Sequence, residues 1–444
     1  MSKFGRSSLP YIFWKRLTSR GYAPSPMWGY FPAQEDLMEQ ARALFRAEEA
    51  RDLKSLVAGK IDDIRYFDVA GMKSAVAICM YGSSGTKLLA SYLDGHDNVI
   101  ALPTDRSTRI YQFFERYQSL ALHDKLIAYP VFANFFQGDF PIAAADYFAA
   151  VKAVCEVYDG WSPEFLESRG AFFQFLHVVY SVALGRRPAS PRPLIVYAQH
   201  FVDDELARRF VEDFPQARFI HMIRDPITNC GRLFDFWFAE KPWGADRNFL
   251  TAGRVLSHLT RADIPHSGME SCTRTIRFED LHSHQEKTIR SVADWLGLAY
   301  RPSLLDSSFN GVPWVVKRET TSWSGPRQAQ SIRDLKNLSF TDRAILFAVL
   351  NEDFVAWNYP CPDIFKYALV RVFTFMVVLL VPMKIEIISV CNLIKAHPLL
   401  RHGGFRQTIH ELGQSLLCRI AIMSLLAVEL YRRLAYGRKV LIVQ

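Results

Sequence analysis

An apolar run that ends in a loop of small residues is the feature that most constrains the fold of this chain. The run SAVAICM (74–80) is followed by YGSSGTKLLASYLDGH (81–96), in which apolar residues recur at helical spacing from Leu88 onward. Small residues at such a turn let backbone N–H groups face an anion, and the helix N-terminus adds partial positive charge. The pattern therefore predicts a strand, a phosphate-binding loop and a helix.

The spacing within this loop differs from that of two common motifs. An ATP-binding Walker loop has four residues between its glycines and then Gly-Lys-Ser/Thr. Here only two residues separate Gly82 from Gly85, and Thr86 precedes Lys87. The Gly-x-Ser-x-Gly turn of many serine hydrolases does not fit either. The loop therefore predicts phosphate binding of a kind other than that of the common NTPases.

Further apolar runs alternate with helical patterns along the chain. Strands are expected at residues 75–80, 194–198, 218–223 and 275–278, with helices at 86–93, at 203–213 and after Pro226. Such alternation is typical of a parallel sheet covered on both faces. The expected fold class is α/β: a P-loop-like parallel sheet flanked by helices, with a helical insertion and a helical C-terminal tail.

Composition divides the chain into three parts. Residues 1–71 form a basic, aromatic and helical lead, and residues 72–360 form the α/β domain, with a helical insertion at 105–193. Within the insertion, residues 111–180 hold 18 aromatic side chains in 70 positions, against 14% in the whole chain. Aromatic residues at helical spacing usually pack into a core. The alternative is an acceptor pocket whose rings stack on sugars.

Residues 361–444 form a basic and apolar tail. They hold eleven Lys/Arg and four Asp/Glu, so +7 of the net charge of +8 lies there, which argues against a nucleic-acid-binding core. The longest uncharged run, 372–383, is shorter than the roughly 20 residues that span a bilayer. Residues 416–439 read as a basic amphipathic helix of the kind that lies in a membrane interface. We expect peripheral attachment to the cytoplasmic face of a membrane; the alternative is a helical pair docked on the core or on a second subunit of a homo-oligomer.

The cysteines and the N-terminus agree with an intracellular location. The seven cysteines include no Cys-x-x-Cys pair, which suits a reducing compartment and argues against structural zinc. Residues 1–35 mix basic and aromatic residues without a continuous apolar run, so no signal peptide is expected there.

Three later segments carry candidate ligand-binding residues. The strand RFIHMI ends in Arg224-Asp225-Pro226, at the edge where open α/β sheets bind ligands. The segment RFEDL (277–281) is followed by WLGL (295–298), and WSGPR (323–327) places Arg327 in a Gly/Pro-rich loop. His200 follows another strand, LIVYA (194–198).

Together with the first loop, these segments resemble the sulfotransferase family, which uses 3′-phosphoadenosine 5′-phosphosulfate (PAPS). The resemblance spans about residues 73–360. It implies that the first loop binds the 5′-phosphosulfate and that arginines bind the 3′-phosphate. The implied 5′-phosphosulfate residues are Ser83, Ser84, Gly85, Thr86 and Lys87, and the implied 3′-phosphate residues are Arg224, Arg232 and Arg327.

Two positions depart from the family pattern. The family's usual cation ahead of Ser-Gly-Thr is Ser83 here, so we expect Lys87 to stabilise the leaving group from the first helical turn. The family's serine eight positions after the arginine is Arg232 here, which can bind phosphate through a charge-assisted fork. Both changes keep positive charge near the expected cofactor.

The resemblance also suggests which residue removes the acceptor proton. His200 precedes Arg224 by 24 residues, as the general base does in the cytosolic branch of the family. Asp105 lies near where the glycan- and tyrosine-modifying branches carry a catalytic glutamate, and it is the second candidate. A histidine near its ordinary pKa suits proton removal at neutral pH. Each residue also has a plain structural interpretation: His200 as a polar strand end, and Lys87 and Arg327 as solvated cations.

The expected activity is therefore transfer of a sulfuryl group from PAPS to a hydroxyl of a glycan, lipid-linked glycan or lipid, with no metal required. The tail and the aromatic insertion favour such acceptors over a small soluble phenol. Two alternatives stay open: a membrane-associated scaffold that binds nucleotide without turnover, and a nucleotide-dependent kinase, which the loop spacing disfavours.

Overall fold

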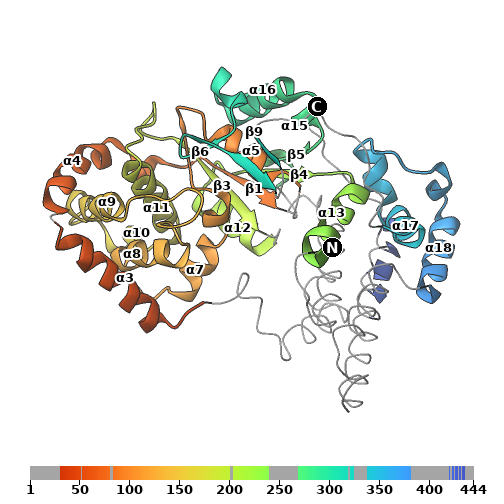
Figure 1. The fold of residues 1–444 in the computed structure, drawn as a ribbon, viewed down its shortest axis with the longest axis horizontal. Helices are drawn as coiled ribbons and strands as arrows, with labels where there is room; N and C mark the ends of the chain where they lie inside the picture. Colours follow the sequence, from red (N-terminus) through yellow and green to blue (C-terminus); the bar gives the residue numbers. More distant parts are fainter. Residues whose placement is uncertain are drawn as a thin grey trace, which may run out of the picture.

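A five-stranded sheet forms the centre of the computed structural model (Figure 1). The structure describes residues 31–51, 53–80, 84–200, 204–239, 269–318, 321–324 and 338–381, with 420, 423–424, 426–428, 430–431 and 433–435. The strands are β1 (Ala75–Met80), β2 (Val99–Ala101), β3 (Leu194–His200), β4 (Arg218–Ile223) and β5 (Thr273–Arg277). Their order is β2-β3-β1-β4-β5, and every neighbouring pair is parallel. The expected parallel α/β sheet is confirmed.

The strand order determines where a ligand can bind. The chain leaves β1 toward β2 on one side of the sheet, whereas it leaves β4 toward β5 on the other. Because β1 and β4 are neighbours, their following loops diverge and leave a crevice at their carboxyl ends. The loops after these two strands carry the Ser84–Lys87 and Arg224–Asp225 segments of the sequence analysis.

Both faces of the sheet are covered, which explains why β1 and most of β3 and β4 are apolar, whereas the edge strand β5 (TRTIR) carries two arginines. Alternate residues of β1 enter different cores: Ala75, Ala77 and Cys79 pack in one, and Val76 and Ile78 in the other. The second core includes side chains of α5 (Thr86–Leu93) and α16 (Gln285–Leu296). Three further helices connect or follow the strands: α12 (Asp204–Asp213), α13 (Pro226–Ala239) and α15 (Asp280–Ser283). Two short antiparallel pairs come later in the chain: β6 (Ser308–Phe309) with β7 (Val312–Pro313), and β8 (Val315–Arg318) with β9 (Thr321–Ser324).

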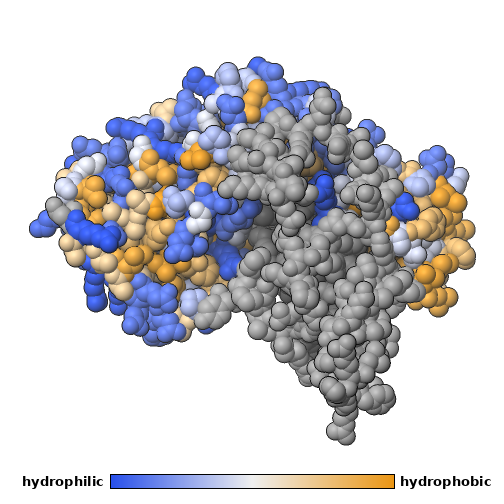
Figure 2. All heavy atoms as spheres, viewed as in Figure 1, coloured by the Kyte–Doolittle hydropathy of each residue, from blue (hydrophilic) through white to orange (hydrophobic). Residues whose placement is uncertain are grey.

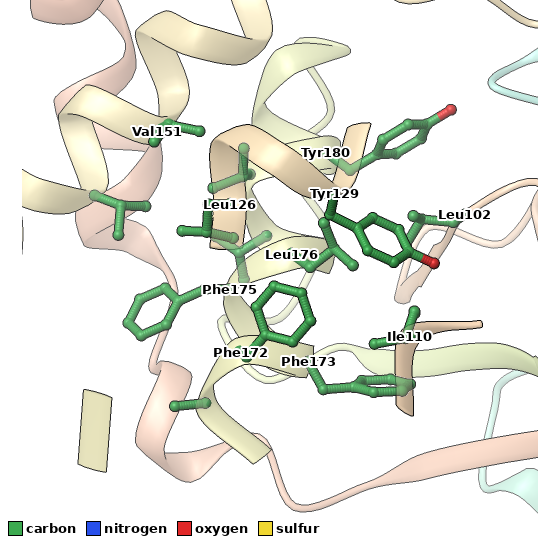
Figure 3. Packing of buried hydrophobic residues seen from close by; sticks show 14 of the residues in the cluster. Leu102, Ile110, Leu126, Tyr129, Val151, Phe172, Phe173, Phe175, Leu176 and Tyr180 are labelled. Atoms are coloured by element: carbon green, nitrogen blue, oxygen red, sulfur yellow. The ribbon is translucent and has the colours of Figure 1, made fainter. Parts of the chain in front are cut away.

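A layer of helices covers the other face and lies at one end of the molecule (Figure 1). It combines α3 (Gln34–Glu49) and α4 (Leu53–Tyr66) with the insertion helices α6 (Thr104–Ser107), α7 (Ile110–Arg116), α8 (Leu122–Phe132), α9 (Ala144–Val157), α10 (Pro163–Leu166) and α11 (Arg169–Ala183). Its aromatic residues pack together: Tyr129, Phe172, Phe173 and Phe175 are all buried (Figure 3). Rings enclosed in this way fill a core and cannot stack on a sugar, so they agree with the packing interpretation.

A smaller core at the opposite end holds the helices that follow the sheet (Figure 1). There α17 (Phe340–Ala356) begins with a capping box between Ser339 and Asp342 and packs against α18 (Ala368–Leu380). Residues 423, 426 and 430 are buried in the same core. The described parts of the tail therefore pack against α17. Within the part of the chain that the structure describes, no helix is both long and apolar enough to cross a membrane.

Candidate active site

The loop between β1 and α5 depends on glycine at position 85. Gly85 precedes the first helical residue and has a φ of 96°, in the left-handed region that L side chains rarely adopt. A Cβ atom added there would lie 2.3 Å from Cδ2 of Phe278. Only glycine therefore lets this turn pack against the residue that follows β5.

Beside this glycine, the loop presents a buried hydroxyl group and a helix N-terminus. The Ser84 side chain is buried, and its Oγ has no hydrogen-bond partner among the described residues. Thr86 Oγ1 donates to the carbonyl of Cys79 at 3.3 Å, which ties the start of α5 to the end of β1. The first N–H groups of a helix have no intrahelical acceptor. An anion held at this turn would satisfy both these groups and Ser84.

Lys87 and Asp105 form an ion pair beside the glycine loop. Lys87 lies in the first turn of α5, Asp105 lies in α6, and their Nζ and Oδ2 atoms are 2.5 Å apart. The two side chains are 42% and 72% exposed, so solvent screens the pair. The sequence analysis selected Lys87 and Asp105 for separate roles, and in the structure the two side chains are in contact.

Two arginines lie close together after β4. Arg224 follows the strand and Arg232 lies in α13. Burial lowers the pKa of Arg224, and the nearby positive charge of Arg232 lowers it further, against the opposing effect of Glu279. The Arg232 Nε atom is buried without a hydrogen-bond partner among the described residues. A bound anion would relieve both the repulsion and the desolvation.

Phe278 joins the two loops. It packs against Gly85, and the Arg224 guanidinium lies 4.3 Å from its ring centroid. This ring contact helps to orient the planar guanidinium group. The glycine loop and the arginine loop are therefore parts of one site.

Glu279 holds the arginine loop in place through two hydrogen bonds. Its two carboxylate oxygens accept from the backbone N–H of Asp225 at 3.1 Å and from the hydroxyl of Tyr359 at 2.6 Å. Burial and the neighbouring Glu279 charge raise the pKa of Tyr359 well above its ordinary value, so the hydroxyl stays protonated and donates. Asp225 in turn accepts from the N–H of Thr228 at 2.8 Å and caps α13.

The remaining predicted residues are only partly described. The backbone of His200 ends β3 and is in register with Met80 at the end of β1, which places it at the same edge of the sheet. The side chain of His200, and all of Ser83 and Arg327, lie outside the described residues. A separate hollow of about 450 Å³ includes Asp36, Arg109 and Phe132 in its lining and none of the predicted site residues.

Sequence reasoning did not select the residues that support the site. Phe278 and Glu279 were noted only as part of a resembling segment, and Tyr359 was not selected for any role. Arg277 was also missed, although it ends β5 as Arg224 follows β4. Its Nε is 3.6 Å from Asp280 Oδ2, and its guanidinium lies 4.9 Å from the ring centroid of Tyr359. A charged residue at the end of a parallel strand was the signal that could have found it.

The family model described as the Sulfotransferase family matches residues 76–302, just over half of the chain. No curated protein matches the chain.

Solved structures similar to the chain include three sulfotransferases. The sulfotransferase domain from the curacin biosynthetic pathway is 16% identical and covers 53% of this chain and 77% of its own, with a TM-score of 0.31. The sulfotransferase domain from the Synechococcus PCC 7002 olefin synthase is 18% identical and covers 54% of this chain and 80% of its own, with a TM-score of 0.28. A Mycobacterium avium sulfotransferase is 10% identical and covers 66% of this chain and 84% of its own, with a TM-score of 0.31.

These TM-scores are too low to support a family assignment. The assignment rests on the family-model match over residues 76–302, which includes both loops of the site. The chain belongs to the sulfotransferase family.

Proposed function

We propose that this protein transfers a sulfuryl group from PAPS to a hydroxyl of a glycan, lipid-linked glycan or lipid. The observation that carries the proposal is the pair of loops at the ends of β1 and β4, which Phe278 joins. PAPS has two separate anionic groups, a 5′-phosphosulfate and a 3′-phosphate. One loop for each group is the arrangement that such a donor requires.

The described residues fit this donor. The Ser84 hydroxyl and the Arg232 Nε are buried without hydrogen-bond partners among the described residues, and burial disfavours the charged form of Arg224. Buried polar groups are normally satisfied, so Ser84 and Arg232 point to an anionic ligand, and such a ligand would also favour the charged form of Arg224. We assign Ser84, Gly85 and Thr86 to the 5′-phosphosulfate, and Arg224 and Arg232 to the 3′-phosphate. When bound, PAPS supplies the sulfuryl group and a phosphate leaving group.

Lys87 is the residue to which we assign charge stabilisation. Its ammonium group is held by Asp105 at 2.5 Å beside the glycine loop, and stabilisation of developing charge is most effective when the stabilising group is already in position. In this proposal Asp105 positions Lys87. The acceptor proton is then taken by His200, the first candidate base, with Asp105 as the second.

We expect Lys87→Ala and Arg224→Ala to affect different kinetic parameters. Loss of a charge that acts mainly on the leaving group lowers kcat, whereas loss of a 3′-phosphate contact raises the KM for PAPS. Each change should cost about 2–3 kcal/mol of transition-state stabilisation, which is about 30- to 150-fold in kcat/KM. Transfer of ³⁵S from labelled PAPS to a membrane lipid and polysaccharide extract measures both parameters.

Two controls sharpen this test. Lys87→Arg keeps the charge and should retain part of the activity, and Arg290→Ala removes an exposed arginine of α16 and should leave both parameters unchanged. If Lys87→Ala raises KM alone, Lys87 binds the donor without assisting transfer. If the unmodified protein binds PAPS but transfers no label to any extract, the scaffold alternative replaces the proposal.

A further inference from the structure

The outward face of α18 is a continuous apolar stripe. Six of its residues recur at intervals of three and four, the spacing that places side chains on one side of a helix. Leu369, Phe373 and Leu380 are 85%, 70% and 86% exposed. The stripe appears in Figure 2 as the hydrophobic surface at the right edge of the molecule. We call it the α18 stripe: Leu369, Val372, Phe373, Met376, Val377 and Leu380.

The opposite face of α18 is fixed to the protein, so the helix cannot turn this stripe inward. Phe375 and Val378 are buried in the core shared with α17. Arg371 is also buried; its Nε donates to the carbonyl of Ala348 at 2.6 Å and its Nη2 donates to Glu352 at 2.9 Å. Docking therefore uses one side of the helix and leaves the apolar stripe on the other side exposed.

We propose that the α18 stripe inserts into the interface of an anionic membrane, with the helix parallel to the surface. Thirteen residues of helix are about 20 Å long, too short to cross the hydrocarbon core. A helix that is docked on one side and apolar on the other can reach lipid only by lying flat.

The residues before α18 suit an interface position. Lys366 and Tyr367 precede the first turn, both are exposed, and the Lys366 ammonium lies 5.2 Å from the centroid of the Tyr367 ring. Tyrosine and lysine are the residues that anchor proteins at the level of the lipid headgroups. They extend the α18 stripe with side chains that suit the boundary between the acyl chains and the lipid phosphates.

Charge favours lipid over a second copy of the chain. Residues 361–444 hold eleven Lys/Arg and four Asp/Glu, a net charge of +7. Two copies that met through the α18 stripe would bring two such segments together, and like charges repel. An anionic lipid surface attracts the same segment. The inference is independent of the proposed function, since it concerns only where the protein binds.

Co-sedimentation of the full chain with vesicles tests the proposal. Phosphatidylcholine vesicles with 30% phosphatidylserine should bind the protein at least tenfold more tightly than phosphatidylcholine alone, because they add the electrostatic attraction. The double variant Leu369→Asp/Phe373→Asp should bind the anionic vesicles at least tenfold more weakly, because it places charge in the stripe. The milder Phe373→Ser should give a smaller loss in the same direction.

A matched control and a second measurement keep the test decisive. Val312 of β7 is an exposed apolar residue elsewhere on the molecule, so Val312→Asp should bind vesicles as the unmodified protein does. Light scattering after size exclusion reports the oligomeric state. Equal vesicle binding by the double variant and the unmodified protein would overturn the proposal. So would an unmodified dimer that ignores vesicles and becomes monomeric in the double variant, because the stripe would then be a subunit interface.

Discussion

Replacement of Gly85 by alanine is expected to weaken donor binding strongly and to lower transfer activity with it. The new Cβ would lie 2.3 Å from Phe278 Cδ2, and the φ of 96° would strain any L side chain. Relief of the contact moves the loop away from Phe278 and withdraws Ser84 and the first N–H groups of α5 from the anion. Loss of two charge-assisted hydrogen bonds costs about 3 kcal/mol, or about 150-fold in affinity. Calorimetric titration with adenosine 3′,5′-bisphosphate measures this loss.

Gly297 supplies the matched control for this change. It ends α16 with a φ of 73°, but an added Cβ there meets no atom within 4 Å. Gly297→Ala should therefore cost only the backbone strain, about 1 kcal/mol of stability, and leave bisphosphate affinity unchanged. In a Phe278→Ala background, Gly85→Ala should likewise cost only this strain. An equal loss of bisphosphate affinity in both backgrounds would mean that the contact with Phe278 does not constrain the loop.

Replacement of Arg433 by methionine is expected to cause the largest loss of folding stability. Its Nη1 donates to Asp353 Oδ2 at 2.5 Å and lies 3.8 Å from Glu352 Oε2, and both Arg433 and Asp353 are buried. Removal of one member of a buried ion pair leaves a charge without its compensation and costs about 3–5 kcal/mol. Urea denaturation with linear extrapolation measures the free energy of unfolding.

An exposed pair provides the comparison. Arg290 and Glu286 are 2.8 Å apart one helical turn from each other, and both are more than half exposed. Arg290→Met should therefore cost less than about 1 kcal/mol. The double variant Arg433→Met/Asp353→Leu should lose less stability than Arg433→Met alone. If Arg433→Met is as mild as Arg290→Met, the C-terminal segment does not stabilise α17.

This ion pair bears on whether the tail is a separate part of the chain. Because the expected cofactor residues all precede Pro360, the sequence suggests that a chain ending there would fold and bind nucleotide. The contacts of Phe375, Val378 and Arg433 with the α17 core favour the docked alternative, in which that truncation destabilises the protein. Docking and membrane contact are compatible, since they use opposite faces of α18.

The sheet could be predicted because its chemistry is local. Strands buried on both faces must be continuous apolar runs, and β1, β3 and β4 are visible as such in the sequence. The short strand β2 has only three residues, and its apolar run, VIAL (99–102), is too short to indicate a strand by itself. It exists because it pairs with β3.

The site residues likewise fall into those that a single segment predicts and those that depend on contacts between distant segments. Ser84, Gly85, Thr86 and Arg224 could be selected because small residues at a turn and a cation at a strand end are properties of single segments. The contact between Gly85 and Phe278 and the hydrogen bond from Tyr359 to Glu279 join segments far apart in the chain. No spacing in one sequence reports such contacts.

Thermal unfolding with two nucleotides tests the central claim most directly. A ligand that binds only the folded protein raises the melting temperature by mass action. Adenosine 3′,5′-bisphosphate should raise it by several degrees at millimolar concentration, whereas ATP, which has no 3′-phosphate for Arg224 and Arg232, should raise it much less. The difference should disappear in Arg224→Ala. Equal shifts from both nucleotides in the unmodified protein, or no shift from the bisphosphate, would contradict a PAPS site in this protein.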